Sequence, residues 1–471
     1  MACSPPFFAD RSFPQRHGIA RLGMTVASLL TALVLGASRA DAQLDARALI
    51  GKAVDEVGPK HSDVEKAIER YRVRDTQGAL EFLEAARRKD PNVPPAEIVL
   101  AKMHLAAGQT PAARTALEEV TEKYPNDPEP YLIFGERAFA ANRLSDAQLL
   151  FAKGLQLASA YRENPIRRSN LLVRSHAGLA SVAERREDWA TAAEHLQQWV
   201  EEDPESATAK HRLGRSRFML GDAREAYALF QEAAKGDTSL PSPAATIGAL
   251  YEQRGGRSEA TQLMERALRD DSASIQTLLA VARWQLETEQ YAKAQTVLDA
   301  ALRREPESLD ALLLSGIVSR MLKNYDAAED KFEQAHVLAP TNFDAMNQLA
   351  LVLIEQSDTE KQQRAVQYGE LNLRLHNNNP EAGVAVGWIY YQLGRTQDAE
   401  RILNAALKAG RMGPDSSYFV AKIFFDRGLS STAVSLLESA LESDALFVQR
   451  SDAQTLLARI KRTSPATGAG E

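Results

Sequence analysis

The 34-residue stretch 241–274, PSPAATIGALYEQRGGRSEATQLMERALRDDSAS, decides the fold of this chain. Its central alanine, Ala260, is followed four positions later by a bulky apolar residue, Met264. The same alanine recurs along the chain with a period of 34 residues, interrupted twice. The recurring residues are Ala79, Ala113, Ala147, Ala192, Ala226, Ala260, Ala294, Ala328, Ala365, Ala399 and Ala433. A fixed period of this length predicts an array of helical hairpins, each burying its apolar face against its neighbours.

Small residues and helix breakers complete the pattern around each alanine. Gly248 lies twelve positions before Ala260, and small residues at the equivalent positions of other units allow two helices to approach closely. Glycines fall where the turn inside a hairpin is expected, at Gly108, Gly221, Gly255 and Gly394. Glycine suits such turns because it tolerates the left-handed conformation. Each unit therefore reads as helix, turn, helix, and the sequence predicts an all-α protein.

These positions resemble the tetratricopeptide repeat. In the stretch quoted above, Ile247, Gly248, Tyr251, Ala260 and Met264 occupy the characteristic sites. About eleven units follow the pattern over residues 60–447. The resemblance implies a right-handed superhelical solenoid whose concave wall is made by the first helix of each hairpin.

Two insertions and the C-terminal residues depart from the period. Eleven extra residues around 162–172 separate the third and fourth units, and three extra residues near 357–363 lengthen the turn inside the ninth. We expect surface loops without a function, with part of a binding face as the alternative. Residues 448–462 are predicted to form a capping helix over the last hairpin. Residues 463–471 are predicted to be a disordered tail.

The first 42 residues have the pattern of an export signal. Three arginines precede the largely apolar and uncharged stretch 24–37, and small residues then surround a cleavage site before Gln43. We therefore expect a signal peptide over residues 1–42 and a leader helix over residues 43–59. An uncleaved N-terminal anchor is the alternative. Cleavage predicts a periplasmic or extracellular, envelope-associated protein without a membrane span.

Composition argues against several classes of function. The one cysteine, Cys3, lies in the predicted signal peptide, so the mature chain has no thiol for a disulfide, a metal or a nucleophile. The net charge of −7 argues against a nucleic-acid partner, which requires a basic surface. The eight histidines form no HExxH motif, and the sequence contains no phosphate-binding loop and no GxSxG motif. The sequence therefore predicts no enzyme, no metal and no cofactor.

Candidate binding residues follow from the inward-facing positions that the resemblance implies. In the last four units they are Leu313, Ile317, Leu351, Ile354, Val384, Trp388, Tyr391, Tyr418 and Phe425. The basic candidates are Arg215, Arg283 and Arg320. Trp, Tyr and Arg are the residue types that most often anchor protein interfaces. The alternative is that Trp388 and Tyr391 only pack against neighbouring hairpins.

The predicted function is that of a non-enzymatic scaffold that binds a protein or peptide partner along its concave groove. By analogy with similar envelope proteins, the scaffold serves the assembly of a cell-envelope, secretion or polysaccharide-export complex. A carbohydrate-binding or enzyme-associated accessory module is the alternative, because Trp and Tyr also stack on sugars. Self-association into a homo-oligomer through the C-terminal units is a third interpretation.

Overall fold

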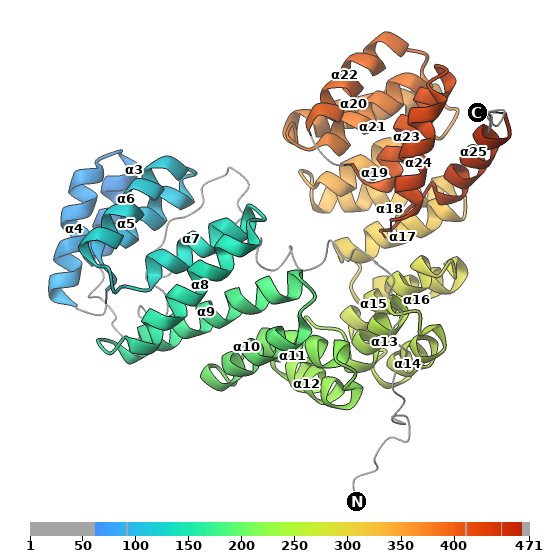
Figure 1. The fold of residues 1–471 in the computed structure, drawn as a ribbon. Coiled ribbons are helices and arrows are strands. Elements are labelled where there is room, and N and C mark those ends of the chain that lie inside the picture. The colour runs from blue at the N-terminus through green and yellow to red at the C-terminus, as the bar shows by residue number, and fades with distance from the viewer. Residues whose placement is uncertain (1–61, 91–92, 410–411, 444, 464–471) are drawn as a thin grey trace, which may run out of the picture. The chain divides into compact units, whose positions relative to one another are not determined.

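All regular secondary structure in the described part of the chain is helical. The computed structural model describes residues 62–90, 93–409, 412–443 and 445–463. The chain divides between Pro243 and Ala244 into two compact units, here called the N-terminal unit and the C-terminal unit (Figure 1). The predicted signal peptide, the predicted leader helix and residues 464–471 of the predicted tail lie outside the described residues.

The N-terminal unit consists of five helical hairpins in sequence, drawn from blue to green in Figure 1. Their helices are α3 (Ser62–Arg72) and α4 (Thr76–Lys89), α5 (Ala96–Ala106) and α6 (Thr110–Lys123), α7 (Glu129–Ala140) and α8 (Leu144–Ala160), α9 (Pro165–Arg185) and α10 (Trp189–Glu202), and α11 (Ala207–Met219) and α12 (Ala223–Gly236). Each first helix packs against its second helix, and each first helix after α3 also packs against the hairpin that precedes it.

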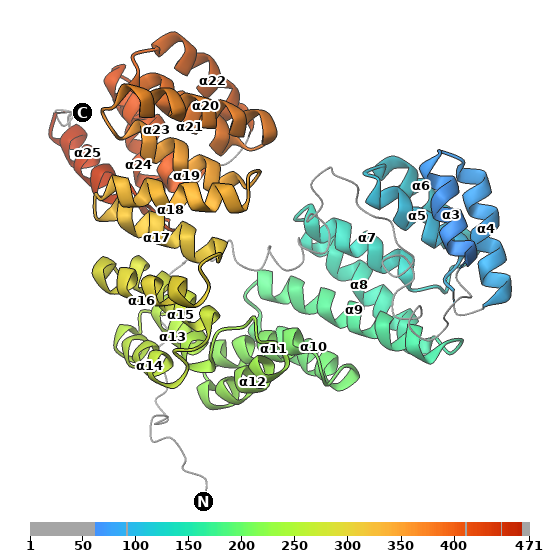
Figure 2. The ribbon, with the colours of Figure 1, turned by 180° about the vertical axis from the view of Figure 1, so that it is seen from behind.

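The C-terminal unit contains six further hairpins and one additional helix. The hairpins are α13 (Pro243–Gln253) and α14 (Arg257–Asp270), α15 (Ile275–Glu287) and α16 (Tyr291–Arg304), α17 (Leu309–Met321) and α18 (Tyr325–Leu338), α19 (Phe343–Ile354) and α20 (Thr359–Leu375), α21 (Pro380–Gln392) and α22 (Thr396–Ala409), and α23 (Pro414–Asp426) and α24 (Ser430–Leu441). Helix α25 (Arg450–Thr463) packs on α23 and α24, beside α24 in both Figure 1 and Figure 2.

The turn inside a hairpin depends on one residue in the left-handed conformation. Ten hairpins have such a residue, five glycines and five others: Arg74, Gly108, Asn142, Glu187, Gly221, Gly255, Glu289, Lys323, Gly394 and Gly428. The predicted turn glycines are therefore confirmed. An Asp or Asn often follows and caps the second helix, as Asp222 does by accepting a hydrogen bond from the Glu225 backbone N–H at 2.9 Å.

The core of each hairpin is built on the recurring alanine. Ala260 and its equivalents are at most 1% exposed. In ten of the eleven units a bulky residue four positions later is at most 2% exposed and fills the space beside the small residue of the first helix, whereas the ninth unit has Gly369 there. A Cβ atom on Gly316 would lie only 2.4 Å from the Phe332 ring, so the two helices can approach this closely only with glycine there. The predicted all-α array of about eleven hairpins with a capping helix is confirmed.

Both insertions lengthen helices, which corrects the expectation of surface loops. Helix α9 begins at Pro165 and has 21 residues, because Asn164 caps it by accepting a hydrogen bond from the Arg167 backbone N–H at 3.0 Å. Asn164, Leu171 and Leu172 are at most 5% exposed, so these three residues of the inserted stretch belong to the packed structure. The second insertion similarly gives α20 a length of 17 residues.

Candidate functional site

An aromatic cluster forms between α21 and α23 of the C-terminal unit. The Trp388 ring stacks on Phe419 with 4.6 Å between ring centroids, and on Tyr391 with 5.9 Å. Tyr418 lies at the side of the cluster, 6.4 Å from Trp388. The structure therefore brings three of the predicted aromatic residues together. Trp388 is nevertheless only 8% exposed, since Phe419 covers one ring face and Tyr391 stacks beside it.

The apolar candidates divide into a buried and a half-buried group. Ile317, Leu351, Ile354, Val384 and Trp388 are at most 9% exposed and belong to one core cluster. The expectation that they present an open apolar wall needs correction, because side chains of the adjacent hairpins cover them. Leu313, Tyr391, Tyr418 and Phe425 keep part of their surface exposed. The Tyr391 hydroxyl donates a hydrogen bond to the Asp426 carboxylate, and the Arg459 guanidinium lies 5.4 Å from the Phe425 ring.

The three arginine candidates do not form one site. Arg320 is 5% exposed, and its Nη1 donates a hydrogen bond to Gln348 Oε1 at 2.6 Å. It also forms an ion pair with Glu355 at the end of α19. Arg283 lies exposed on α15. Arg215 belongs to the N-terminal unit, where its guanidinium lies 5.7 Å from the Trp189 ring centroid and burial lowers its pKa.

Four acidic residues at the start of successive first helices were missed by the sequence analysis. They are Asp310, Asp344, Glu381 and Asp415, and their regular spacing along the chain was a signal that could have found them. Glu381 accepts hydrogen bonds from the Gly413 backbone N–H and the Ser416 hydroxyl, at the start of α23. Burial raises the pKa of Asp344, and Asp310 and Glu381 raise it further. Burial also raises the pKa of Asp415, to about 6.

A network of buried charges joins three first helices of the N-terminal unit. Glu129 on α7 is 3% exposed and forms ion pairs with Lys102 on α5 and with Arg167 and Arg174 on α9. Burial alone would raise the pKa of Glu129, but the three cations together hold it well below its usual range. Arg167 comes from the first insertion. The network therefore ties the inserted part of α9 to the preceding hairpins.

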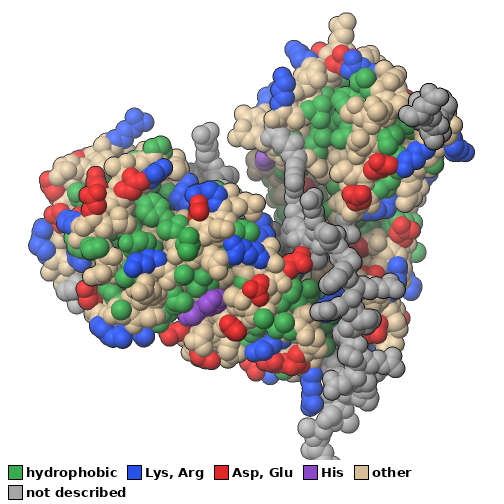
Figure 3. Space-filling view, viewed as in Figure 1, with side chains coloured by type: hydrophobic (Ala, Val, Ile, Leu, Met, Phe, Trp, Pro, Cys, Tyr) green, Lys and Arg blue, Asp and Glu red, His purple; other side chains and the backbone are tan. Residues whose placement is uncertain are grey.

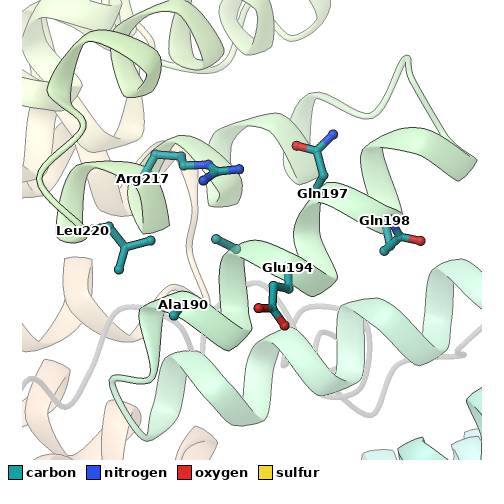
Figure 4. Close-up of a pocket in the computed structure, with 7 residues that line it drawn as sticks. Ala190, Glu194, Gln197, Gln198, Arg217 and Leu220 are labelled. Atoms are coloured by element: carbon teal, nitrogen blue, oxygen red, sulfur yellow. The ribbon is translucent and has the colours of Figure 1, made fainter.

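A shallow surface hollow of about 420 Å³ lies between α10 and α11. Figure 4 shows its mixed lining, with the amides of Gln197 and Gln198, the charged groups of Glu194 and Arg217, and the apolar side chain of Leu220. Leu220 is 49% exposed. The hollow is open and places no nucleophile beside a base, so its geometry does not suggest catalysis.

The remaining surface of the described residues was searched by charge, by metal-ligating side chains and by apolar helices. Acidic and basic side chains are intermixed on the face seen in Figure 3. Nowhere in the described residues do three or more His, Cys, Asp or Glu side chains gather in a way that could hold a metal ion. Among the described helices, none is long and apolar enough to cross a membrane.

Comparison with known proteins identifies the family. Tetratricopeptide repeat models match residues 72–132, and residues 178–241, 282–345 and 385–446, together just over half of the chain. A TPR repeat-containing protein of Pseudomonas aeruginosa is 28% identical over 209 residues, 42% of this chain and 34% of the relative. The matched part of the chain thus spans about a third of that relative's length.

Two further similar proteins cover more of the chain. The TPR repeat-containing protein YpiA of Bacillus subtilis is 21% identical over 372 residues, which are 79% of this chain and 77% of the relative. The crystal structure of a tetratricopeptide repeat protein from Parabacteroides merdae is 15% identical, with a TM-score of 0.42, and covers 62% of this chain and 99% of its own. With the repeat models matched in both units, the chain belongs to the tetratricopeptide repeat family.

Proposed function

We propose that this protein is an exported, non-enzymatic scaffold that binds a protein or peptide partner along the inner face of its hairpin array. Tetratricopeptide repeats mediate protein–protein interactions. The observation that carries the proposal for this chain is the row of half-buried and exposed side chains at the inward-facing positions of the C-terminal unit, including Leu313, Tyr391 and Arg283. Tyrosine and arginine supply large contact areas and directional hydrogen bonds to a partner.

The carbohydrate-binding alternative is weaker for this arrangement. A sugar stacks on the open face of an aromatic ring, whereas Trp388 is 8% exposed and stacked against Phe419. Tyr391 has its hydroxyl engaged with Asp426. The C-terminal aromatics therefore suit the side of a bound peptide better than the face of a sugar ring.

Export is proposed from the sequence of residues 1–42, and its test is direct. Expression of the full chain with a C-terminal tag should place the protein in the periplasmic or secreted fraction, with Gln43 as the first residue by N-terminal sequencing. Export would place the scaffold where it could serve the assembly of an envelope, secretion or polysaccharide-export complex. Recovery of an uncut chain from the cytosol would contradict the proposal, and an uncut chain in the membrane fraction would support the anchor alternative.

Partner capture tests the binding face. The chain from Gln43 is immobilised beside a variant with Tyr391→Ala and Arg283→Glu, and both are exposed to an envelope extract analysed by mass spectrometry. We expect a partner that the unchanged chain retains and the variant loses at least tenfold. Neither substitution removes a fully buried side chain, so the variant should fold normally by circular dichroism.

The matched control carries Tyr227→Ala and Arg303→Glu, the same chemical changes on the second helices α12 and α16. It should retain the partner like the unchanged chain. Equal retention by all three proteins would place binding elsewhere. A glycan array and sedimentation of the unchanged chain test the carbohydrate and homo-oligomer alternatives directly.

A further inference from the structure

The connector between α24 and α25, residues 445–449, packs on two different cores. Phe447 is 3% exposed and belongs to the small cluster of α23, α24 and α25. Leu446 and Val448, on the opposite side of the connector, pack against the large core cluster that contains Trp388. Because neighbouring residues of the connector contact different clusters, the connector is inserted between these two cores.

The backbone of the connector is held by an acidic side chain. Asp415 accepts hydrogen bonds from the backbone N–H groups of Val448 at 3.2 Å and Gln449 at 2.8 Å. Glu381, one repeat earlier, similarly accepts from the backbone of Gly413 and the hydroxyl of Ser416 at the start of α23. Helix α25 is therefore docked in the way that the first helix of a twelfth repeat would be.

One contact goes beyond this regular stacking. Gln449 Nε2 donates a hydrogen bond to Glu355 Oε1 at 3.1 Å, across 94 residues of sequence. Glu355 follows α19 in the ninth hairpin and also forms an ion pair with Arg320. In a solenoid each repeat contacts mainly its immediate neighbours. The contact passes over the tenth hairpin and places the connector beside Glu355 at the end of α19 as well as beside Asp415 on α23.

The surroundings of the connector define the chemistry of a segment that can lie there. The large core cluster that contains Trp388 accepts two aliphatic side chains separated by one residue, as Leu446 and Val448 show. Asp415 requires backbone N–H groups at the next positions, and Glu355 requires an amide or another hydrogen-bond donor. After these residues the segment must form a helix with one apolar face, since Leu456 and Ile460 of α25 are 6% and 1% exposed.

We propose that the seat of the connector beside α19 and α23, together with the face of α23 and α24 that α25 covers, is the docking site for a partner segment of this chemistry, and that residues 446–460 occupy it in cis until the partner displaces them. The partner segment has two aliphatic residues in alternation, then an amide side chain, and continues as an amphipathic helix. Its affinity is reduced by the fraction of molecules in which the connector is in place, so release of the connector strengthens binding. This inference rests on the proposed scaffold function and assigns the site and the partner's chemistry.

The test uses a peptide with the sequence of residues 443–463, labelled with fluorescein, as the probe. Its binding to the chain from Gln43 is measured by fluorescence polarisation, beside a variant with Leu446→Ser and Val448→Ser. These substitutions weaken the packing of the connector on the large core cluster and leave the residues of that cluster unchanged. We expect the peptide to bind the variant at least ten times more tightly than the unchanged chain. The same peptide with Gln449→Ala should bind several times more weakly.

The matched control carries Leu149→Ser and Val337→Ser, the same changes at side chains that are 71% and 78% exposed. It should bind the peptide as weakly as the unchanged chain. Equal binding by all three proteins, or binding by none, would overturn the proposal. A variant that becomes a dimer on sedimentation would also overturn it, since the occupant would then be a second copy of the chain.

A single substitution, Gln449→Ala in the chain, gives a second measurement if the double variant does not fold. It removes only the hydrogen bond to Glu355 and should increase peptide binding about threefold, and no change would count against the proposal. Capture from the envelope extract distinguishes a failure of the displacement proposal from a failure of the scaffold function. A partner retained equally with and without the serine substitutions would leave the scaffold function standing and reject displacement. Tight peptide binding by the released variant without any captured protein would support the docking site and count against the scaffold function.

Discussion

Replacing Glu129 by alanine should lower the free energy of unfolding of the N-terminal unit by about 4 kcal/mol. The side chain is 3% exposed and is the common partner of Lys102, Arg167 and Arg174. Its removal leaves three cations together in a site that water reaches poorly. Arginine cannot lose its proton to escape this cost, because its pKa is far above neutrality. Asp127 and Glu136 compensate only part of the remaining charge.

Controls separate the loss of charge from the loss of packing. Glu129→Gln keeps the shape and should cost less than alanine, while Lys102→Met in the alanine background should recover 1–2 kcal/mol, roughly the penalty of one unpaired cation. The matched exposed pair is Glu118 with Arg114, at 2.7 Å, so Glu118→Ala should leave the stability nearly unchanged. Native-state hydrogen exchange in α5, α7 and α9 measures the effect. A loss below about 1 kcal/mol for Glu129→Ala would mean that water solvates the cations.

The hairpins could be predicted because their information is local and periodic. Ala260 and its equivalents must be small wherever two helices cross, and the turn needs one left-handed residue, so both recur at a fixed spacing. The length of α9 could not be read in this way. Its inserted residues have no counterpart in other units, and the helix is fixed by the cap at Asn164 and the distant partners of Arg167.

The candidate site was predicted less well, because exposure depends on contacts between distant hairpins. The inward-facing positions were identified from the repeat, and Trp388 does lie beside Tyr391 and Tyr418. Their degree of burial depends on how strongly the array curves, which the repeat pattern does not encode. The contact between Gln449 and Glu355 likewise joins residues of distant hairpins, so the repeat pattern could not predict it. The acidic residues at the starts of successive first helices recur at a regular spacing that the sequence analysis did not use, as Glu381 and Asp415 show.

Acidification from pH 7 to pH 4 should destabilise the N-terminal unit by about 5 kcal/mol, through His176 and His211. Burial lowers the pKa of His176 to about 4, helped by the neighbouring His195 and opposed by Glu201. Burial lowers the pKa of His211 to about 4 as well, helped by Arg215 and opposed by Asp237.

The sign follows from comparing the folded and unfolded states. The unfolded chain binds protons on these histidines near the ordinary pKa of 6.5, and the folded unit does so only near 4. Stability is therefore complete above pH 6.5 and is lost as the pH falls to 4, by about 2–3 kcal/mol for each histidine. His176→Gln with His211→Gln should remove most of this dependence, since glutamine does not titrate. A decline of equal size in the double variant would assign the effect to other groups.

The C-terminal unit provides an internal contrast, because Asp415 acts in the opposite direction. Burial raises its pKa from an ordinary 3.8 to about 6, so its contribution to stability is present below pH 3.8 and is lost as the pH rises through 6. On acidification this residue should stabilise its unit by about 2 kcal/mol. Hydrogen exchange corrected for the intrinsic effect of pH should then show α9–α11 losing protection at pH 4.5 while α23 and α25 keep theirs. Parallel loss in both units would contradict these assignments, because the histidines and Asp415 require opposite signs.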